Sequence, residues 1–148
     1  MPFVFIGLGT NLGNKKANMQ KACDCLIGIE GIELVKKSSI EETEPVDFLE
    51  QPSFLNQIIL IETSLKPEEL LKHMQSIESG MGREKIIPKG PRIIDLDILL
   101  YDDLIQDTQD LKIPHPEIKN RQFILKHLLE LNPDLIDPET GRGYKDFF

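Results

Sequence analysis

The pattern of apolar and polar positions along the chain predicts four strands and three helices. Short apolar runs bounded by turn residues predict strands at residues 3–9, 32–40, 54–63 and 93–100. Apolar residues that recur every three or four positions predict helices at residues 19–26, 64–82 and 120–131. Residues 41–53 have two prolines and little periodicity, so they are predicted to form a long loop.

The second predicted helix has the clearest end signals. Ser64 is the expected N-cap, Pro67 falls in the first turn, and Gly80 and Gly82 end the helix. Its apolar stripe consists of Leu70, Leu71, Met74 and Ile77. The acidic residues of the tail that follows the third helix are expected to lie on the solvated surface.

The order strand, helix, strand, strand, helix, strand predicts an α+β fold of the ferredoxin-like sandwich type. Such a fold has a mainly antiparallel sheet with flanking helices. The long loop and the last helix would be additions to it. With 148 residues, the chain is expected to be a single domain spanning residues 1–148.

The charge of the chain is unevenly distributed. The formal net charge of −8 argues against a general nucleic-acid-binding protein, which needs surplus Lys and Arg. Residues 82–92 nevertheless carry four basic side chains and one acidic one, which suits a small polyanion. The pair Cys23 and Cys25 matches neither a disulfide framework nor a metal ligand set. No membrane-spanning or signal segment is recognised, so a cytoplasmic location is expected. No long apolar surface stripe suggests an obligate dimer, so a monomer is expected.

Two aspartates interrupt the fourth predicted strand. Ile94, Leu96, Ile98 and Leu100 form one apolar face, and Asp95 and Asp97 share the other. Carboxylates at i and i+2 lie about 7 Å apart and raise each other's pKa unless a cation lies near. Two explanations are open: an ion pair with Arg92, or a Mg²⁺ site that shares the phosphates of a ligand.

Familiar phosphate-binding loops are absent from the sequence. The segment GLGTNLG has its third glycine one place too late for the G-x-G-x-x-G motif, and no Gly-Lys-Ser/Thr follows as in a P-loop. Phosphates would therefore be held by side chains and metal ions. The cationic segment next to the Asp-bearing strand favours magnesium together with a polyphosphate.

Four blocks of sequence carry a family resemblance. They are IGLGTNLG at 6–13, ETEPVDFLEQPSFLNQ at 42–57, GPRIIDLDILLY at 90–101 and IPHPEIKNRQFIL at 113–125. Together they resemble the 6-hydroxymethyl-7,8-dihydropterin pyrophosphokinases of folate biosynthesis, from about Phe3 to Leu131. The resemblance implies transfer of a diphosphate from ATP to the hydroxymethyl group of the pterin, with release of AMP and with two Mg²⁺ ions as cofactors.

The resemblance also implies roles for individual residues. Asp95 and Asp97 would bind the metal ions, and with Arg83 and Arg92 they would form the catalytic group. The nucleotide and its phosphates would contact Gln75, Glu78, Arg83, Lys85, Arg92, Ile98, His115 and Arg121. The pterin would be stacked between Phe54 and Phe123, and would contact Asn11, Thr43 and Asn56. His73 and His127 are assigned no role.

Some positions depart from the family pattern. Lys89 stands where many members have Trp, Pro88 where Arg is frequent, and Lys85 replaces a frequent Arg. Phe54 replaces a frequent Tyr and keeps the stacking face. These changes affect the cationic segment, which with the long loop is expected to act as a lid over both substrates.

Three other classes of protein compete with this interpretation. Another magnesium-dependent transferase would need a different motif spacing: nucleotidyltransferases carry their Gly-Ser element close to the D-x-D. A ligand-sensing ferredoxin-like module would not need a carboxylate pair beside a cationic segment. An RNA-recognition module would need aromatic platforms on a basic surface. The enzyme interpretation is favoured, with ATP and a hydroxymethyl dihydropterin as small-molecule partners.

Overall fold

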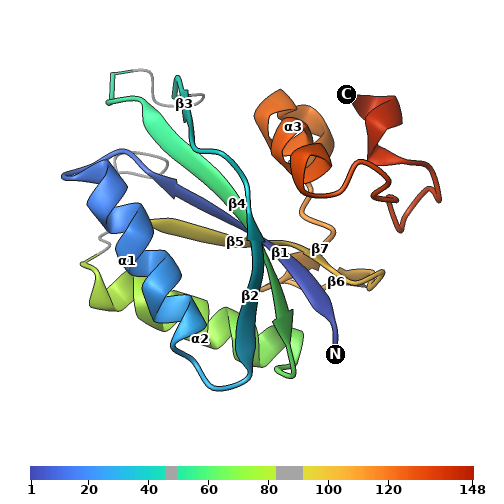
Figure 1. Ribbon diagram of the computed structural model, residues 1–148, viewed down its shortest axis with the longest axis horizontal. Coiled ribbons are helices and arrows are strands. Elements are labelled where there is room, and N and C mark those ends of the chain that lie inside the picture. The colour runs from blue at the N-terminus through green and yellow to red at the C-terminus, as the bar shows by residue number, and fades with distance from the viewer. Residues whose placement is uncertain (46–49, 83–91) are drawn as a thin grey trace.

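A five-stranded antiparallel sheet forms the centre of the computed structural model, which describes residues 1–45, 50–82 and 92–148 (Figure 1). The main strands lie in the order β2-β4-β1-β5, and β3 pairs with β4 beyond the end of β2. The strands of this sheet are β1 (Phe3–Thr10), β2 (Ile32–Lys37), β3 (Glu41–Thr43), β4 (Phe54–Thr63) and β5 (Asp95–Tyr101). A small second sheet pairs β6 (Gln106–Asp107) with β7 (Lys112–Ile113).

The helices divide between the two faces of the sheet. Figure 1 shows α1 (Lys15–Ile27) and α2 (Pro67–Gly80) on one side, and α3 (Gln122–Leu131) with the C-terminal segment on the other. Two short 3₁₀ turns, η1 (Ile118–Asn120) and η2 (Tyr144–Phe147), flank α3 in sequence. The element order and the antiparallel sheet agree with the predicted sandwich.

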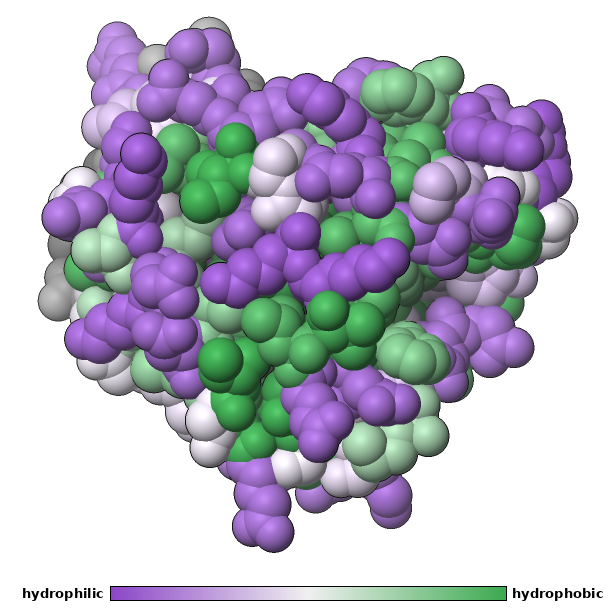
Figure 2. Space-filling view, viewed as in Figure 1, coloured by the Kyte–Doolittle hydropathy of each residue, from purple (hydrophilic) through white to green (hydrophobic). Residues whose placement is uncertain are grey.

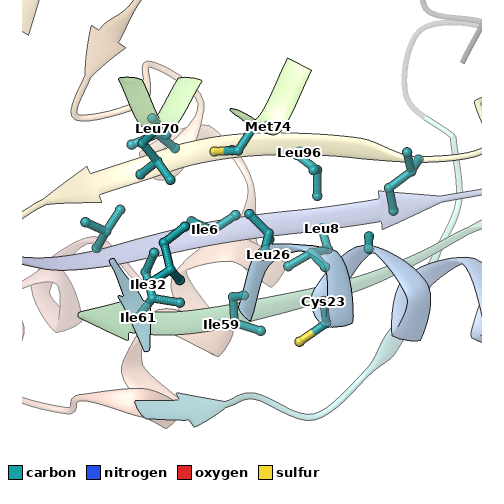
Figure 3. Packing of buried hydrophobic residues seen from close by; sticks show 14 of the residues in the cluster. Ile6, Leu8, Cys23, Leu26, Ile32, Ile59, Ile61, Leu70, Met74 and Leu96 are labelled. Carbon is teal, nitrogen blue, oxygen red and sulfur yellow. The ribbon is translucent and has the colours of Figure 1, made fainter. Parts of the chain in front are cut away.

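The first hydrophobic cluster fills the space between the sheet and the helices α1 and α2. Alternate strand residues such as Ile6, Ile59 and Leu96 meet the apolar stripes of the helices, and Cys23 is buried among them (Figure 3). The exposure of Cys25 follows from the helical period, because the two cysteines point to different sides of α1.

The second hydrophobic cluster lies between the sheet and α3. Its members show that the side chains of β5 do not alternate between the two faces of the sheet along the whole strand. Leu99 and Leu100 both pack in this second cluster, although Leu100 was expected to share the face of Ile98. The reason is a β-bulge at Leu99: Phe5 pairs with Leu100 and Ile6 pairs with Ile98, so Leu99 is an extra residue in β5 and the alternation changes there. The prediction of one apolar face from Ile94 to Leu100 is therefore wrong at its last residue.

Two further expectations need correction. The predicted loop at 41–53 begins with β3, whose three residues pair with β4. Helix α2 begins at Pro67 with Lys66 as N-cap, and not at Ser64. Proline suits the first helical position because it lacks the N–H that would have no partner there, and it holds the preceding residue in an extended conformation.

On the face seen in Figure 2, hydrophilic side chains alternate with apolar patches. β2 lies at an edge of the sheet, and all its residues except Ile32 are exposed. Within the described part of the chain, no helix has both the length and the apolar character needed to cross a bilayer.

An internal ion pair anchors the C-terminal segment. The carboxylate of Asp137 is fully buried, contrary to the expected solvation of the tail acids, and it lies 2.7 Å from Lys119 Nζ. It also accepts hydrogen bonds from the Thr140 hydroxyl and the Glu139 N–H. Burial alone would raise the pKa of Asp137, but these donors outweigh it and lower the pKa below its ordinary value of 3.8. The same carboxylate lies beside the buried Tyr144, whose pKa is raised by burial and by the adjacent charge.

We expect Lys119→Met to lower the free energy of unfolding by about 2–3 kcal/mol at pH 7, because a buried carboxylate then lacks its cation. The value is below the usual range for buried pairs because the Lys119 side chain is one-third exposed. Urea denaturation measures the change. Lys112→Met, which removes a pair between two exposed side chains, is the control and should change stability by less than about 0.5 kcal/mol.

The pH dependence of this loss provides a second measurement. A carboxyl group with a lowered pKa stabilises the fold above its ordinary pKa, and this contribution disappears as the pH falls through the folded-state value. The difference between wild type and Lys119→Met should therefore narrow in acid, below the ordinary value of 3.8. Equal stabilities of Lys119→Met and Lys112→Met at pH 7 would contradict the role of the ion pair.

Candidate active site

The register of the neighbouring strands β4, β1 and β5 brings the candidate residues into rows across the sheet face that α3 covers. Gly9 of β1 pairs with Asn56 on one side and with Asp95 on the other. In the next row, Gly7 lies between Ile58 and Asp97. Adjacent strands are about 4.8 Å apart, so Asn56 and Asp95 are separated by roughly 10 Å of sheet surface.

Glycine in the middle strand leaves this surface open. A Cβ atom added at Gly9 would lie 3.4 Å from Asn56 Oδ1 and 3.9 Å from Phe54 Cδ1. One added at Gly7 would lie 3.5 Å from Leu99 Cδ1. Both glycines therefore form the low floor of a depression between the Asn56 side and the aspartate side.

A cleft of about 310 Å³ lies above this floor. Its other walls come from α3 and from the segment that leads into it. Among the residues that line the cleft are nine that the sequence singled out: Thr43, Phe54, Asn56, Arg92, Asp95, Asp97, His115, Arg121 and Phe123. Residues that are up to 80 positions apart in sequence thus meet at one site.

The two aspartates have different neighbours. Asp95 is half-buried, and its Oδ2 lies 3.4 Å from Nη1 of Arg92. Asp97 is exposed, and its Oδ1 lies 3.9 Å from Nε2 of His115. The ion pair with Arg92 that the sequence left open is therefore formed by Asp95, while Asp97 faces an imidazole.

The donor set of the site fits a hard cation that keeps other ligands. Among the described residues, no group of three or more His, Cys, Asp or Glu side chains could hold a metal ion. Asp95 and Asp97 supply carboxylate oxygens from one strand face. Mg²⁺ is commonly bound through one or two carboxylates, with water and substrate phosphates as the remaining ligands.

Arg92 also contacts the aromatic wall. Its guanidinium carbon lies 5.5 Å from the centre of the Phe54 ring, at cation–π distance. A flat ring that stacks on this face of Phe54 would have to displace the guanidinium. Nearby, Asn56 Nδ2 donates to Thr43 Oγ1 at 2.6 Å, which fixes the orientation of the amide in the cleft.

The geometry around His115 defines its hydrogen-bonding state. The Glu117 N–H donates to Nδ1, so the proton of a neutral ring is on Nε2, the nitrogen that faces Asp97. Burial lowers the pKa of His115 below its ordinary value of 6.5. At neutral pH the ring therefore offers an N–H donor to the cleft without a fixed positive charge.

Asn11 lies beside the cleft and is absent from its lining. Its side chain is buried, and its amide donates to Gln51 Oε1 and to the Pro52 carbonyl. Its Oδ1 accepts from the backbone N–H of Arg92 at 2.7 Å. In the described structure Asn11 thus connects the end of β1 to the two segments that precede β4 and β5.

The residues predicted for the nucleotide are spread over a wider area. Ile98 lines a second hollow of about 240 Å³, which it shares with Asp97, His115 and Leu71 of α2. Glu78 is buried, and its Oε2 accepts the Leu96 N–H at 2.8 Å, so it holds the start of β5. Gln75 is exposed on α2 and lines neither hollow.

Some predicted residues lie outside the described part of the chain, and some contributors were missed. Arg83 and Lys85 belong to the first group, as do Pro88 and Lys89. Gly7 and Gly9 were missed as floor residues, although their alternation in a buried strand was a visible signal. His127 was assigned no role, yet it is buried and lines the cleft.

Comparisons with known proteins identify the family of the chain. Residues 5–133 match the family described as 7,8-dihydro-6-hydroxymethylpterin-pyrophosphokinase. The chain is 39% identical, over 147 residues, to the 2-amino-4-hydroxy-6-hydroxymethyldihydropteridine pyrophosphokinase of Aquifex aeolicus, and the match covers 99% of this chain and 91% of the relative. It is 47% identical over 142 residues to the folic acid synthesis protein fol1 of Schizosaccharomyces pombe, covering 96% of this chain and 19% of that protein.

The fungal relatives are much longer, and the chain spans about a fifth of the length of each. Among solved structures, the fold resembles an HPPK-DHPS protein crystallised in complex with substrates, with a TM-score of 0.76, 15% identity, and coverage of 99% of this chain and 42% of that one. This likeness confirms the ferredoxin-like α+β fold. On the family match and the bacterial relative, the chain belongs to the 7,8-dihydro-6-hydroxymethylpterin-pyrophosphokinase family.

Proposed function

We propose that this chain transfers a diphosphate group from ATP to the hydroxymethyl oxygen of 6-hydroxymethyl-7,8-dihydropterin and releases AMP. The observation that carries the proposal is the row Asn56, Gly9, Asp95 across the cleft floor. In this row, the Asn56 amide can form hydrogen bonds to the edge of a bound ring, and the carboxylate pair lies close enough to reach a group attached to the same ring. The family and the names of the relatives support the same reaction.

The aromatic part of the cleft suits a flat heterocycle. Phe54 and Phe123 come from different elements and both line the cleft, so they can hold a ring between their faces. The Asn56 amide offers a donor and an acceptor to a ring edge that carries both. Thr43 keeps that amide in one orientation through its hydroxyl.

The charged part of the cleft suits a triphosphate. Asp95 and Asp97 would hold Mg²⁺, which supplies charge neutralisation and a template for the phosphate oxygens. Arg92, Arg121 and the Nε2–H of neutral His115 are positioned at the same cleft to donate to further phosphate oxygens. Arg83 and Lys85 are proposed for the same task on the sequence resemblance alone, and Gln75, Glu78 and Ile98 for the nucleotide.

The reaction is an in-line displacement at the β-phosphorus. The hydroxymethyl oxygen forms a bond to this phosphorus while the bond to the oxygen of the α-phosphate breaks, and AMP leaves. Little covalent chemistry is required of the protein in such a transfer. Its contribution is to align the two substrates and to neutralise charge.

Several attributes of the working protein belong to the same proposal. They are two Mg²⁺ ions, ATP as co-substrate, a monomer in the cytoplasm, and no nucleic-acid or membrane partner. The net charge of −8 argues against binding to phosphate backbones. Asn11 is proposed to act on the pterin side through the contacts that fix the segments around the cleft.

The reaction itself can be tested with purified protein, MgATP and 6-hydroxymethyl-7,8-dihydropterin. We expect AMP to accumulate only when the pterin is present, and in equal amount to the diphosphorylated pterin. Chromatographic separation of the nucleotides measures this. ADP as the product, or AMP formed at the same rate without pterin, would refute the assignment.

Replacement of Asp97 separates catalysis from stability. Asp97→Asn should reduce kcat by at least about 10²-fold, because one metal ligand is lost, while the unfolding free energy stays unchanged or rises. Turnover and urea denaturation are measured together, with Asp134→Asn, an exposed residue outside the cleft lining, as control. A stability loss of about 3 kcal/mol would reveal a structural ion pair instead.

Replacement of Gly9 tests the cleft floor. The added methyl group in Gly9→Ala would lie in van der Waals contact with Asn56 and Phe54 and raise the cleft floor between them, so we expect KM for the pterin to rise roughly 10-fold with kcat little changed. The melting temperature should not fall, because alanine restricts the unfolded chain. Gly80→Ala adds a methyl group in open space and should leave both kinetic constants as in wild type. An unchanged KM in Gly9→Ala would show that the ring does not lie on this floor.

A further inference from the structure

A buried histidine contacts two carboxylates next to the cleft. His127 of α3 is 1% exposed, its Nε2 lies 3.0 Å from Glu41 Oε1, and its Nδ1 lies 3.3 Å from Glu130 Oε1. The Nε2 contact is within hydrogen-bond distance but does not have hydrogen-bond angles. A buried ring nitrogen without a well-aligned partner costs stability, and such a group calls for an explanation.

The neighbours of this histidine are mostly charged. Lys126 Nζ lies 3.1 Å from the same Glu41 oxygen. Glu130 accepts from the N–H and the hydroxyl of Ser39, and although burial would raise its pKa, these donors and His127 lower it. Both ring nitrogens of His127 therefore face carboxylate oxygens, one of Glu41 and one of Glu130.

The contact joins the two walls of the cleft. Glu41 of β3 pairs with Asn56, so it extends the row of Asn56, Gly9 and Asp95 by one strand. His127 lies one helical turn after Phe123 on the same side of α3, and both line the cleft. The helix that carries Phe123 is thus tied to the strand beside Phe54 and Asn56.

We propose that His127 is a positioning residue that holds Glu41 of β3 against α3 and thereby sets the gap between Phe123 and the cleft floor. The gap determines how tightly a flat heterocycle is held between the two phenylalanines. This inference rests on the proposed function, since it assigns the residue to the binding of the pterin substrate.

The contact between His127 and Glu41 is expected to affect the position of α3 more than the free energy of folding. The Glu41 side chain is 31% exposed and that of Glu130 is 40% exposed, so ion pairs with them add little to the free energy of folding. Stability therefore depends weakly on the Glu41 contact. The position of a ring that stacks on Phe123 depends on it directly, because the helix has this tie to β3 at the cleft.

Glu41→Gln tests the proposal in the full chain, with Lys126→Met and Glu42→Gln as matched controls. Lys126→Met removes the lysine that pairs with Glu41 and keeps His127, and Glu42 is the exposed neighbour on the same strand. Steady-state kinetics give KM for each substrate. Equilibrium titration with the pterin, in the presence of magnesium and a non-hydrolysable ATP analogue, gives Kd independently of turnover.

We expect Glu41→Gln to raise KM and Kd for the pterin roughly 10-fold, with kcat and KM for ATP within about 2-fold of wild type. Both controls should behave as wild type. His127→Gln should reproduce the effect, and the double variant Glu41→Gln/His127→Gln should lose no more than either single variant, because the two residues act as one unit.

Three results would overturn the inference. The first is that Glu41→Gln binds the pterin with the same Kd as wild type. The second is an equal effect of Lys126→Met, which would assign the tie to Lys126. The third is a rise of both KM values together with a fall in melting temperature, which would indicate a purely structural role. In all three cases wild type still forms AMP with pterin, whereas failure of the proposed function would abolish that reaction in wild type too.

Discussion

The hydrogen-bonding register between β4, β1 and β5 is the constraint on which the rest of the site depends. Because side chains alternate along each strand, a shift of one residue in either pairing would move a whole set of residues to the other face. The observed register puts Asn56, Gly9 and Asp95 in one row and Ile58, Gly7 and Asp97 in the next. The same register sends Ile6, Ile59 and Leu96 into the first hydrophobic cluster. The dry core on one face therefore enforces the arrangement of polar groups on the other.

The two faces of the sheet differ in the side chains that they carry. The face covered by α1 and α2 is packed with aliphatic side chains along the length of the sheet. The face covered by α3 is apolar around Phe5, Leu60 and Leu128, and becomes polar towards Asn56 and the aspartates. α3 thus covers only part of its face, and the uncovered part is the cleft. The bulge at Leu99 allows both Leu99 and Leu100 to complete the apolar part just beyond Asp97.

Much of this could be predicted from the sequence, because the signals were local. Alternation in residues 93–100 predicted that Asp95 and Asp97 share a face, and helical periods predicted the buried sides of α1 and α2. The features that were missed depend on distant parts of the chain. The bulge at Leu99 results from pairing with β1, and β3 exists because β4 offers it a partner. The burial of Asp137 depends on Lys119 of η1, which forms an ion pair with it.

The same distinction applies to the site residues. Phe54, Asn56 and the aspartates were recognised from their motifs, whereas the floor role of Gly9 becomes visible only when its two neighbours across the sheet are known. His127 gave no sequence signal at all, since a histidine on an apolar helix face is usually a core residue. Its significance comes from Glu41, 86 positions away, which β3 brings to the same row as Asn56.

Electrostatics explains why these carboxylates can lie together in an acidic protein. Two carboxylates on one strand repel each other, and a fold tolerates this only if cations or hydrogen-bond donors compensate. Here Arg92 contacts Asp95 and also the Phe54 ring, while the imidazole faces Asp97. Arg92 therefore occupies both halves of the cleft, next to a carboxylate and on an aromatic face. Binding of a cation at the aspartates would weaken the contact of Arg92 with Asp95. Binding of a flat ligand on Phe54 would displace the Arg92 guanidinium from the Phe54 ring. A ligand bound in one half of the cleft would therefore change the other half, through a side chain whose backbone N–H is held by Asn11.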